Sequence, residues 1–180
     1  MKNKVIFVLN LNNGFTTLDE NIKAIVSNVK KFLLENKDDS DIYFVNDLYT
    51  NLDMEFETNK NLYYCNENTD ESNIDSSLLE FVNLQNKFQK NSTNAFWDLD
   101  PNLYLKYNKF TLVGACTDLD ILEFALTLQT YLLKLKLKKN IVVYSDLVAT
   151  FDNENHSYKK YQELSLKLLS QKGILVKKHG

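Results

Sequence analysis

The chain has 180 residues, of which 44% are hydrophobic and 25% are charged. A chain of this length and composition can bury most of its apolar surface around one core, so we expect a single domain over residues 1–180. Its 24 acidic residues outnumber its 21 basic ones, all of them Lys, which gives a formal net charge of −3. A mildly acidic chain without Arg lacks the basic stripe typical of duplex recognition, so we expect no nucleic-acid partner.

No segment has the pattern of a membrane span or a secretion signal. The apolar run at residues 5–9 ends at Asn10, well short of the core of a signal peptide. The longest apolar region, residues 121–137, is interrupted by Glu123, Lys134 and other polar residues. The two Cys residues of such a chain are expected to be free thiols. We therefore expect a cytoplasmic protein with no membrane partner.

The first half of the chain alternates apolar segments of strand and helix type. Residues 5–9 are rich in branched side chains and predict a strand buried on both faces. Thr17 and Glu20 have the spacing of a capping box, and the apolar residues that follow them predict a helix. A second buried strand is predicted at residues 42–45. Residues 46–73 have little periodicity and predict a long loop.

The alternation continues in the second half of the chain. Short elements are predicted at residues 74–81 (helix), around Phe88 (strand) and after Asp100 (helix). The remaining elements, in chain order, are a strand at 110–113, a helix at 120–138, a strand at 141–144, a helix at 157–170 and an edge strand at 174–176. The helix at 120–138 is apolar on nearly every side, so we expect it to be buried in the domain or in a subunit interface. Alternating elements predict an α/β fold, with a mostly parallel sheet covered by helices on both faces.

Ligands of such sheets bind beyond the carboxyl ends of the strands. The residues in that position are Asn10, Asp47, Lys90 and the segment 114–120. These four places are therefore the predicted site.

Short motifs at these strand ends resemble those of the cysteine hydrolases of the nicotinamidase/isochorismatase-like family. In chain order they are residues 8–15, residues 44–47, Cys65 with Thr69, residues 90–96, residues 114–118, and residues 145–151 followed by His156. The resemblance covers almost the whole chain. It implies a three-layer α/β/α sandwich with a six-stranded, mostly parallel sheet. In active members it also implies a catalytic triad of Asp, Lys and Cys, whose thiolate attacks an amide carbonyl.

The resemblance places the triad positions at Asn10, Lys90 and Asp120, so two of the three chemical groups are replaced. An amide such as Asn10 has no basic site near neutral pH, and a carboxylate is a poor nucleophile toward an amide. Asp120 also suits the start of a helix without any functional role. We predict that Lys90 and Asp120 form an ion pair that fills the former catalytic centre.

The metal-binding positions of the family are also substituted. The resemblance places them at Asp47, Tyr49 and Tyr64, and one carboxylate with two neutral phenols is a poor ligand set. The two His residues, His156 and His179, do not repair it. We expect no metal and no other cofactor. Tyr64 and its neighbour Tyr63 either fill the metal cavity or bind a ligand.

Two thiols and two aromatic side chains complete the candidate site. The resemblance implies a cis peptide before Cys116 and an oxyanion hole formed by the N–H groups of residues 116 and 120. Cys116 is a candidate substitute nucleophile, although a free Cys more often packs as a small apolar residue, as we expect of Cys65. Phe15 and Trp97 flank triad positions and are candidate walls of a substrate pocket.

The sequence thus favours a catalytically degenerate family member that binds a small molecule or serves as a partner subunit. One alternative is an active amide or ester hydrolase that uses Asp120 and Lys90 to activate water. A weaker alternative is residual hydrolysis through Cys116. The apolar helix at residues 120–138 leads us to expect a homo-oligomer.

Overall fold

A single parallel sheet runs through the computed structural model, which describes residues 2–17, 19–55 and 65–180. Its strand order is β3-β2-β1-β4-β5-β6. The strands are β1 (Lys4–Leu9), β2 (Ser40–Asp47), β3 (Lys87–Lys90), β4 (Lys109–Ala115), β5 (Asn140–Ala149) and β6 (Leu175–Lys177). Every neighbouring pair in this order is parallel. The predicted parallel six-stranded sheet is therefore confirmed.

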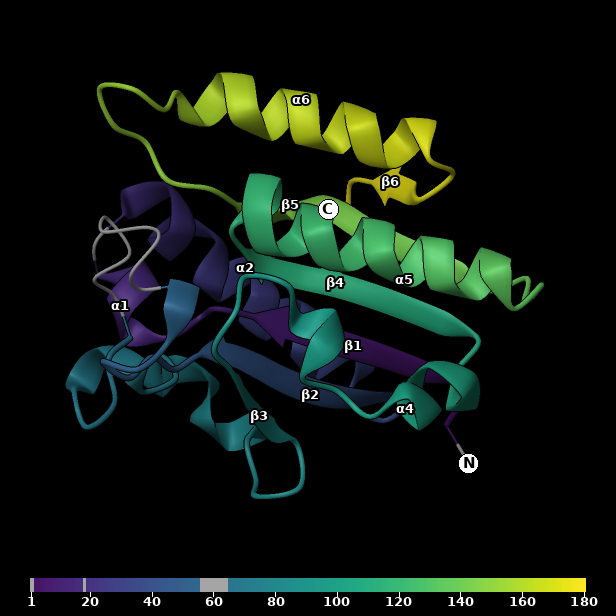
Figure 1. The fold of residues 1–180 in the computed structure, drawn as a ribbon, viewed down its shortest axis with the longest axis horizontal. Helices are drawn as coiled ribbons and strands as arrows, with labels where there is room; N and C mark the ends of the chain where they lie inside the picture. The colour runs from purple at the N-terminus through teal and green to yellow at the C-terminus, as the bar shows by residue number, and fades with distance from the viewer. Residues whose placement is uncertain (1, 18, 56–64) are drawn as a thin grey trace.

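Helices cover both faces of the sheet, which confirms the three-layer α/β/α sandwich (Figure 1). The α-helices are α1 (Asn13–Thr16), α2 (Glu20–Asn36), α4 (Pro101–Lys106), α5 (Leu122–Lys134) and α6 (Tyr158–Gln171). Shorter turns are η1 (Asp70–Ser72), η2 (Ser76–Phe81), η3 (Ala95–Trp97) and the π-helical η4 (Thr117–Ile121). In Figure 1, α5 crosses in front of β4, whereas α2 lies behind the sheet.

The central strand β1 separates two hydrophobic cores. Val5, Phe7 and Leu9 point into the core under α4 and α5, whereas Ile6 and Val8 point into the core under α2. All five side chains are at most 1% exposed. Alternate side chains of a strand point to opposite faces, so a strand covered on both sides is apolar at every position, as predicted for residues 5–9.

The predicted capping box at Thr17 and Glu20 is wrong. The N-cap of α2 is Asp19, whose carboxylate accepts the backbone N–H groups of Asn21 and Ile22 at 2.8 and 3.3 Å. The Thr17 hydroxyl, at the C-cap of α1, instead donates to the carbonyl of Asn13, the first residue of that helix. A carboxylate directly before the first helical residue satisfies two free N–H groups, so it displaces the more distant Thr17.

The helix predicted at residues 120–138 differs in its bounds and its burial. The chain starts to coil at Thr117, in η4, and α5 ends at Lys134, where the chain turns through a positive φ at Lys136. One face of α5 is buried, but Leu133 is 63% exposed. Within the single chain only one layer of the sandwich lies against this helix, so the domain alone does not bury it, and its burial in a subunit interface stays a prediction.

Three shorter predictions differ in detail. The helix expected at residues 74–81 is the tighter 3-10 turn η2, and β6 begins one residue later than predicted. The loop predicted for residues 46–73 begins after Asp47 and contains η1, and its residues 56–64 lie outside the described part of the chain. No helix among the described residues is long and apolar enough to cross a bilayer.

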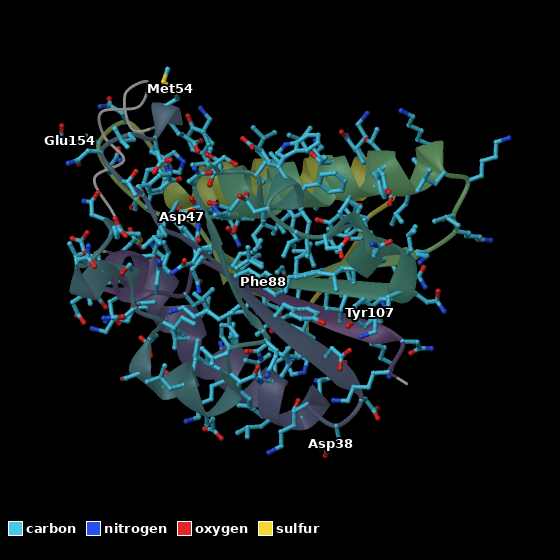
Figure 2. The ribbon with its side chains drawn as sticks, turned by 60° about the horizontal axis from the view of Figure 1, so that its bottom comes forward. Asp38, Asp47, Met54, Phe88, Tyr107 and Glu154 are labelled. Carbon is cyan, nitrogen blue, oxygen red and sulfur yellow. The ribbon has the colours of Figure 1, made fainter. Side chains whose placement is uncertain are left out.

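The carboxyl edge of the sheet lies far from its amino edge. Figure 2 shows Asp47, at the carboxyl end of β2, and Tyr107, before the start of β4, at opposite ends of the sheet, with Phe88 between them. Met54 and Glu154 mark loops at the same end as Asp47. The predicted site residues at the ends of β1, β2, β3 and β4 all belong to this end.

Candidate functional site

The turn after β4 brings Asp120 to the carboxyl edge of the sheet. Gly114 has φ +112°, and a Cβ there would lie 2.0 Å from the carbonyl oxygen of Leu9, so only glycine allows β4 to approach β1 this closely. The peptide before Cys116 is cis, as the resemblance implied. The chain then enters η4, where the N–H of Ile121 donates to the carbonyl of Cys116 at 3.0 Å. Asp120, in this turn, is only 3% exposed.

Asn10 follows β1 and links two carboxylates through its amide. Its Nδ2 donates to Asp47 Oδ2 at 3.1 Å and to Asp120 Oδ1 at 2.8 Å. Its Oδ1 accepts the backbone N–H of Asp47 at 2.9 Å. These partners fix the orientation of the amide, because the reversed orientation would aim an oxygen at two carboxylates. The backbone of Asn10 is left-handed, at φ +49°, a conformation that Asn tolerates better than most residues.

Lys90, the last residue of β3, is the cation of the site and is 1% exposed. Its Nζ donates to Asp120 Oδ1 at 2.7 Å and to the carbonyl of Ser92 at 3.1 Å. Nζ also contacts Asp47 Oδ1 in a short hydrogen bond. The predicted ion pair of Lys90 with Asp120 is therefore present. The sequence did not predict that Asp47 would be a second partner.

Asp120 uses both of its carboxylate oxygens. Oδ1 accepts from Lys90 and Asn10, and Oδ2 accepts the backbone N–H of Cys116 at 3.0 Å. The resemblance places that N–H in an oxyanion hole. In this chain the N–H of Cys116 already donates to the Asp120 carboxylate, so it is not available to an oxyanion.

The cluster of Asn10, Asp47, Lys90 and Asp120 holds two carboxylates and one ammonium group. Burial raises the pKa of the Asp47 carboxyl to about 7; the Lys90 charge opposes this rise and the nearby Asp120 carboxylate adds to it. Burial alone would lower the pKa of Lys90, but attraction to Asp120 and Asp47 outweighs burial and raises that pKa above its ordinary value. Lys90 therefore stays charged, and the pKa of the buried Asp47 carboxyl is raised toward neutral pH.

The metal-binding positions of the family do not fit a divalent ion here. Both oxygens of Asp47 are engaged by Lys90 and Asn10. Asp47 is the one carboxylate among the three metal-binding positions, and the ammonium group beside it repels a second cation. Tyr49 is buried, and burial raises the pKa of its phenol, which therefore stays neutral. Tyr63 and Tyr64 lie outside the described residues. Among the residues that are described, no three His, Cys, Asp or Glu side chains are grouped to hold a metal.

Both cysteines are free and buried. Burial raises the pKa of the Cys116 thiol well above its ordinary value, and nearby Asp120 adds to the rise. The Cys65 thiol accepts a hydrogen bond from Asn12 Nδ2 at 3.0 Å, and burial raises its pKa as well. A thiol that stays protonated is a weak nucleophile, so Cys116 lacks the environment of a reactive cysteine.

The two predicted aromatic walls lie in different surroundings. Phe15, on α1, is half-buried and packs against the core under α2. Trp97 is 71% exposed and meets the ring of Phe96 edge-on, with centroids 5.1 Å apart. It lines a surface groove with Leu126 and Tyr131 of α5. A role for Phe15 or Trp97 in binding a substrate stays a prediction.

These observations define an α/β protein with a buried polar cluster at the carboxyl edge of its sheet. The family model of the isochorismatase domain matches residues 4–170 of the chain, so the chain belongs to the isochorismatase-like family. A comparison with curated proteins finds no match.

Solved structures of hydrolases share the fold over nearly their whole length. A pyrazinamidase/nicotinamidase from Streptococcus mutans has a TM-score of 0.78 and 18% identity, covering 96% of this chain and 99% of that one. A nicotinamidase from Bacillus subtilis has a TM-score of 0.76 and 20% identity, covering 99% and 100%. An isochorismatase-like hydrolase from Alkaliphilus metalliredigens has a TM-score of 0.76 and 19% identity, covering 99% and 95%.

Proposed function

We propose that this chain is a catalytically degenerate member of the isochorismatase-like family that binds a small molecule or serves as a partner subunit. The observation that carries the proposal is the hydrogen bonding of Asp120, at the position of the nucleophile. Its Oδ1 holds Lys90 and Asn10, and its Oδ2 holds the N–H of Cys116. A carboxylate held on both oxygens is not free to attack a carbonyl or to take a proton from water.

The rest of the cluster supports the same proposal. Asn10 donates its amide hydrogens to Asp47 and Asp120, so it offers no base to an incoming nucleophile. The N–H of Cys116 is taken, so a substrate carbonyl would have to displace Asp120 before this donor could stabilise its oxyanion.

One observation favours a second candidate, an amide or ester hydrolase that activates water with Asp120 and Lys90. Burial raises the pKa of the neighbouring Asp47 to about 7, and a general base works best when its pKa is near the pH of the reaction. In that hydrolase, Asp120 would take a proton from water, and Lys90, which contacts both carboxylates, would pass a proton to Asp47 and regain one from Asp120.

We also propose that the chain is cytoplasmic and forms a homo-oligomer through the outer side of α5. The support is the apolar surface there, where exposed Trp97 and Leu133 accompany the half-buried Leu126 and Tyr131. Sedimentation of the purified chain would measure its oligomeric state.

We expect the wild-type chain to release no ammonia above background from nicotinamide, pyrazinamide or N-carbamoylsarcosine. The physical reason is that the site has no thiol at residue 120 and no free base at residue 10. The assay compares the wild type with Lys90→Ala and with Asp120→Asn, which keeps the shape of the carboxylate. The nicotinamidase from Bacillus subtilis serves as the positive control for the assay.

Turnover by the wild type that is lost in both variants would contradict the degenerate assignment and support the water-activating hydrolase. Circular dichroism of each variant checks that a lost signal does not come from unfolding. Binding of the same amides to the wild type, followed by ligand-observed NMR, tests the small-molecule role separately from catalysis.

A further inference from the structure

A second carboxylate of the η4 turn, that of Asp118, contacts a histidine. The carboxylate of Asp118 places Oδ2 2.6 Å from Nε2 of His156, and its Oδ1 accepts a hydrogen bond from the hydroxyl of Thr150. The side chains of His156 and Asp118 are only 13% and 7% exposed. Asp118 belongs to the same turn as Asp120, whereas His156 comes from the loop between β5 and α6.

The hydrogen bonds of His156 determine how many protons its ring carries. Nδ1 lies 3.0 Å from the carbonyl oxygen of Phe151, a group that only accepts, so Nδ1 bears a proton. Nε2 faces the Asp118 carboxylate, which also only accepts while it is ionised. The ring therefore needs two protons to satisfy both partners. A singly protonated ring would aim a lone pair at one of them.

Aromatic rings cover both faces of the imidazole. Phe151 and Tyr161 each stack on it with centroids 3.9 Å apart, at interplanar angles of 19° and 15°. The face of an aromatic ring attracts a cation, so this arrangement favours the charged imidazolium. The backbone of His156 is fixed as well, through two hydrogen bonds with Asn153 at 2.9 and 3.1 Å.

A continuous chain of polar contacts leads from His156 to the candidate site. Asp118 joins His156 to Thr150, and the Thr150 hydroxyl is hydrogen-bonded to the thiol of Cys116. The N–H of Cys116 in turn donates to Asp120. Each carboxylate of the turn thus has a side-chain nitrogen facing it, Lys90 Nζ for Asp120 and His156 Nε2 for Asp118.

We propose that doubly protonated His156 holds the loop of residues 150–157 against η4 through Asp118, and that this loop separates from η4 when the second ring proton is lost. We call this contact the clasp. When the pH rises and that proton leaves, attraction between the ring and Asp118 changes into repulsion between a lone pair and a carboxylate. The loop is then held only by its remaining contacts, and Cys116 beneath it gains access to solvent.

Among the residues that the structure describes, few other titratable groups face the ring. Asp118 contacts it from η4, and Tyr161 stacks on it from α6. The carboxylates of its own loop, at Asp152 and Glu154, are exposed, as are Lys159 and Lys160 of α6. Asp118 is thus the carboxylate in direct contact with the ring.

The protonation state is tested first, by NMR of the ring nitrogens in the native chain. We expect protons on both Nδ1 and Nε2 of His156 at neutral pH, with Asp118 ionised. A single ring proton at neutral pH, or a neutral ring beside a protonated Asp118, would overturn the proposal. This measurement needs no variant.

Separation of this loop from η4 is tested by alkylating Cys116 with N-ethylmaleimide. The chain has two cysteines, so Cys116 is the only reporter in a Cys65→Ser background. In that background, His156→Phe keeps a stacking ring but removes both N–H donors, and we expect labelling to accelerate about tenfold or more. Asp118→Asn is the second variant and should accelerate labelling in the same direction.

The matched control is His179→Phe, the same substitution at the other histidine, which meets the rings of Phe32 and Tyr144 edge-on. We expect its labelling rate to equal that of the parent. The ratio of the His156→Phe rate to the parent rate should fall toward one as the pH passes the titration of the His156 ring. A ratio that stays constant across that titration, or equal acceleration by His179→Phe, would refute the clasp.

Discussion

Replacing Lys90 by Met is expected to lower the free energy of unfolding by about 3–5 kcal/mol at pH 8. Lys90 is 1% exposed and is the cation that pairs with both Asp47 and Asp120, which are 4% and 3% exposed. Met keeps most of the side-chain volume, so the loss of stability measures the cost of leaving two buried carboxylates without their cation. Urea denaturation followed by circular dichroism gives the free energy.

The loss should be smaller at pH 5 than at pH 8. Burial already raises the pKa of Asp47 to about 7 beside Lys90, and removing the positive charge raises it further. A carboxyl with a raised pKa binds its proton more tightly in the folded chain than in the unfolded one. Stability from this group is therefore present at low pH and is lost as the pH rises from about 4 through the folded-state pKa.

The matched control for this substitution is Lys87→Met on the same strand. Lys87 is exposed, so its replacement should change the free energy of unfolding by at most about 0.5 kcal/mol at either pH. Equal, small losses for Lys87→Met and Lys90→Met at pH 8 would mean that the buried ion pairs contribute no net stability.

The fold could be predicted because its signals are local and repeated. Each buried strand is a short apolar run, each helix has an apolar periodicity, and their alternation leaves few topologies other than a parallel sheet. The ends of parallel strands meet at one edge, so Asn10, Lys90 and Asp120 could be placed together from the sequence. The ion pair of Lys90 with Asp120 followed from that placement and from opposite charge.

The role of Asp47 could not be read from the sequence in the same way. The resemblance placed it with the metal-binding positions, so the predicted ion pair of Lys90 with Asp120 did not include it. Its register partner in β2–β3 pairing is Lys90, which brings the two side chains to the same edge. Register depends on how two strands pair, and the sequence of β3, four residues long, contains little to fix it.

The pairing of His156 with Asp118 was also beyond the sequence. The two residues are 38 positions apart along the chain, and the loop that carries His156 turns back through an isolated β-bridge between Asn153 and His156. The missed cap at Asp19 has a similar cause, since Thr17 and Asp19 both have side chains that cap helices. In each case the three-dimensional arrangement decides which pair of residues is in contact, whereas the residue types alone allow several different pairs.

Replacing Asn10 by Asp, which restores the acid found in active relatives by the resemblance, is expected to destabilise the chain by about 3 kcal/mol or more at pH 8. The amide of Asn10 donates to Asp47 and Asp120, so a carboxylate in its place would put three acids around Lys90. The left-handed backbone at this position is also accessible to Asp, so backbone strain is not the cause.

The reciprocal variant Asn10→Asp with Asp120→Asn is expected to recover at least half of that loss. It restores the number of buried charges, but the new amide at residue 120 must aim its NH2 at either Lys90 or the N–H of Cys116, so we expect the recovery to be incomplete. The same substitution at exposed Asn102, in the first turn of α4, serves as the control and should shift the free energy by at most about 0.5 kcal/mol. A double variant no more stable than Asn10→Asp alone would mean that hydrogen-bond geometry, and not the count of buried charges, determines which residues this centre accepts.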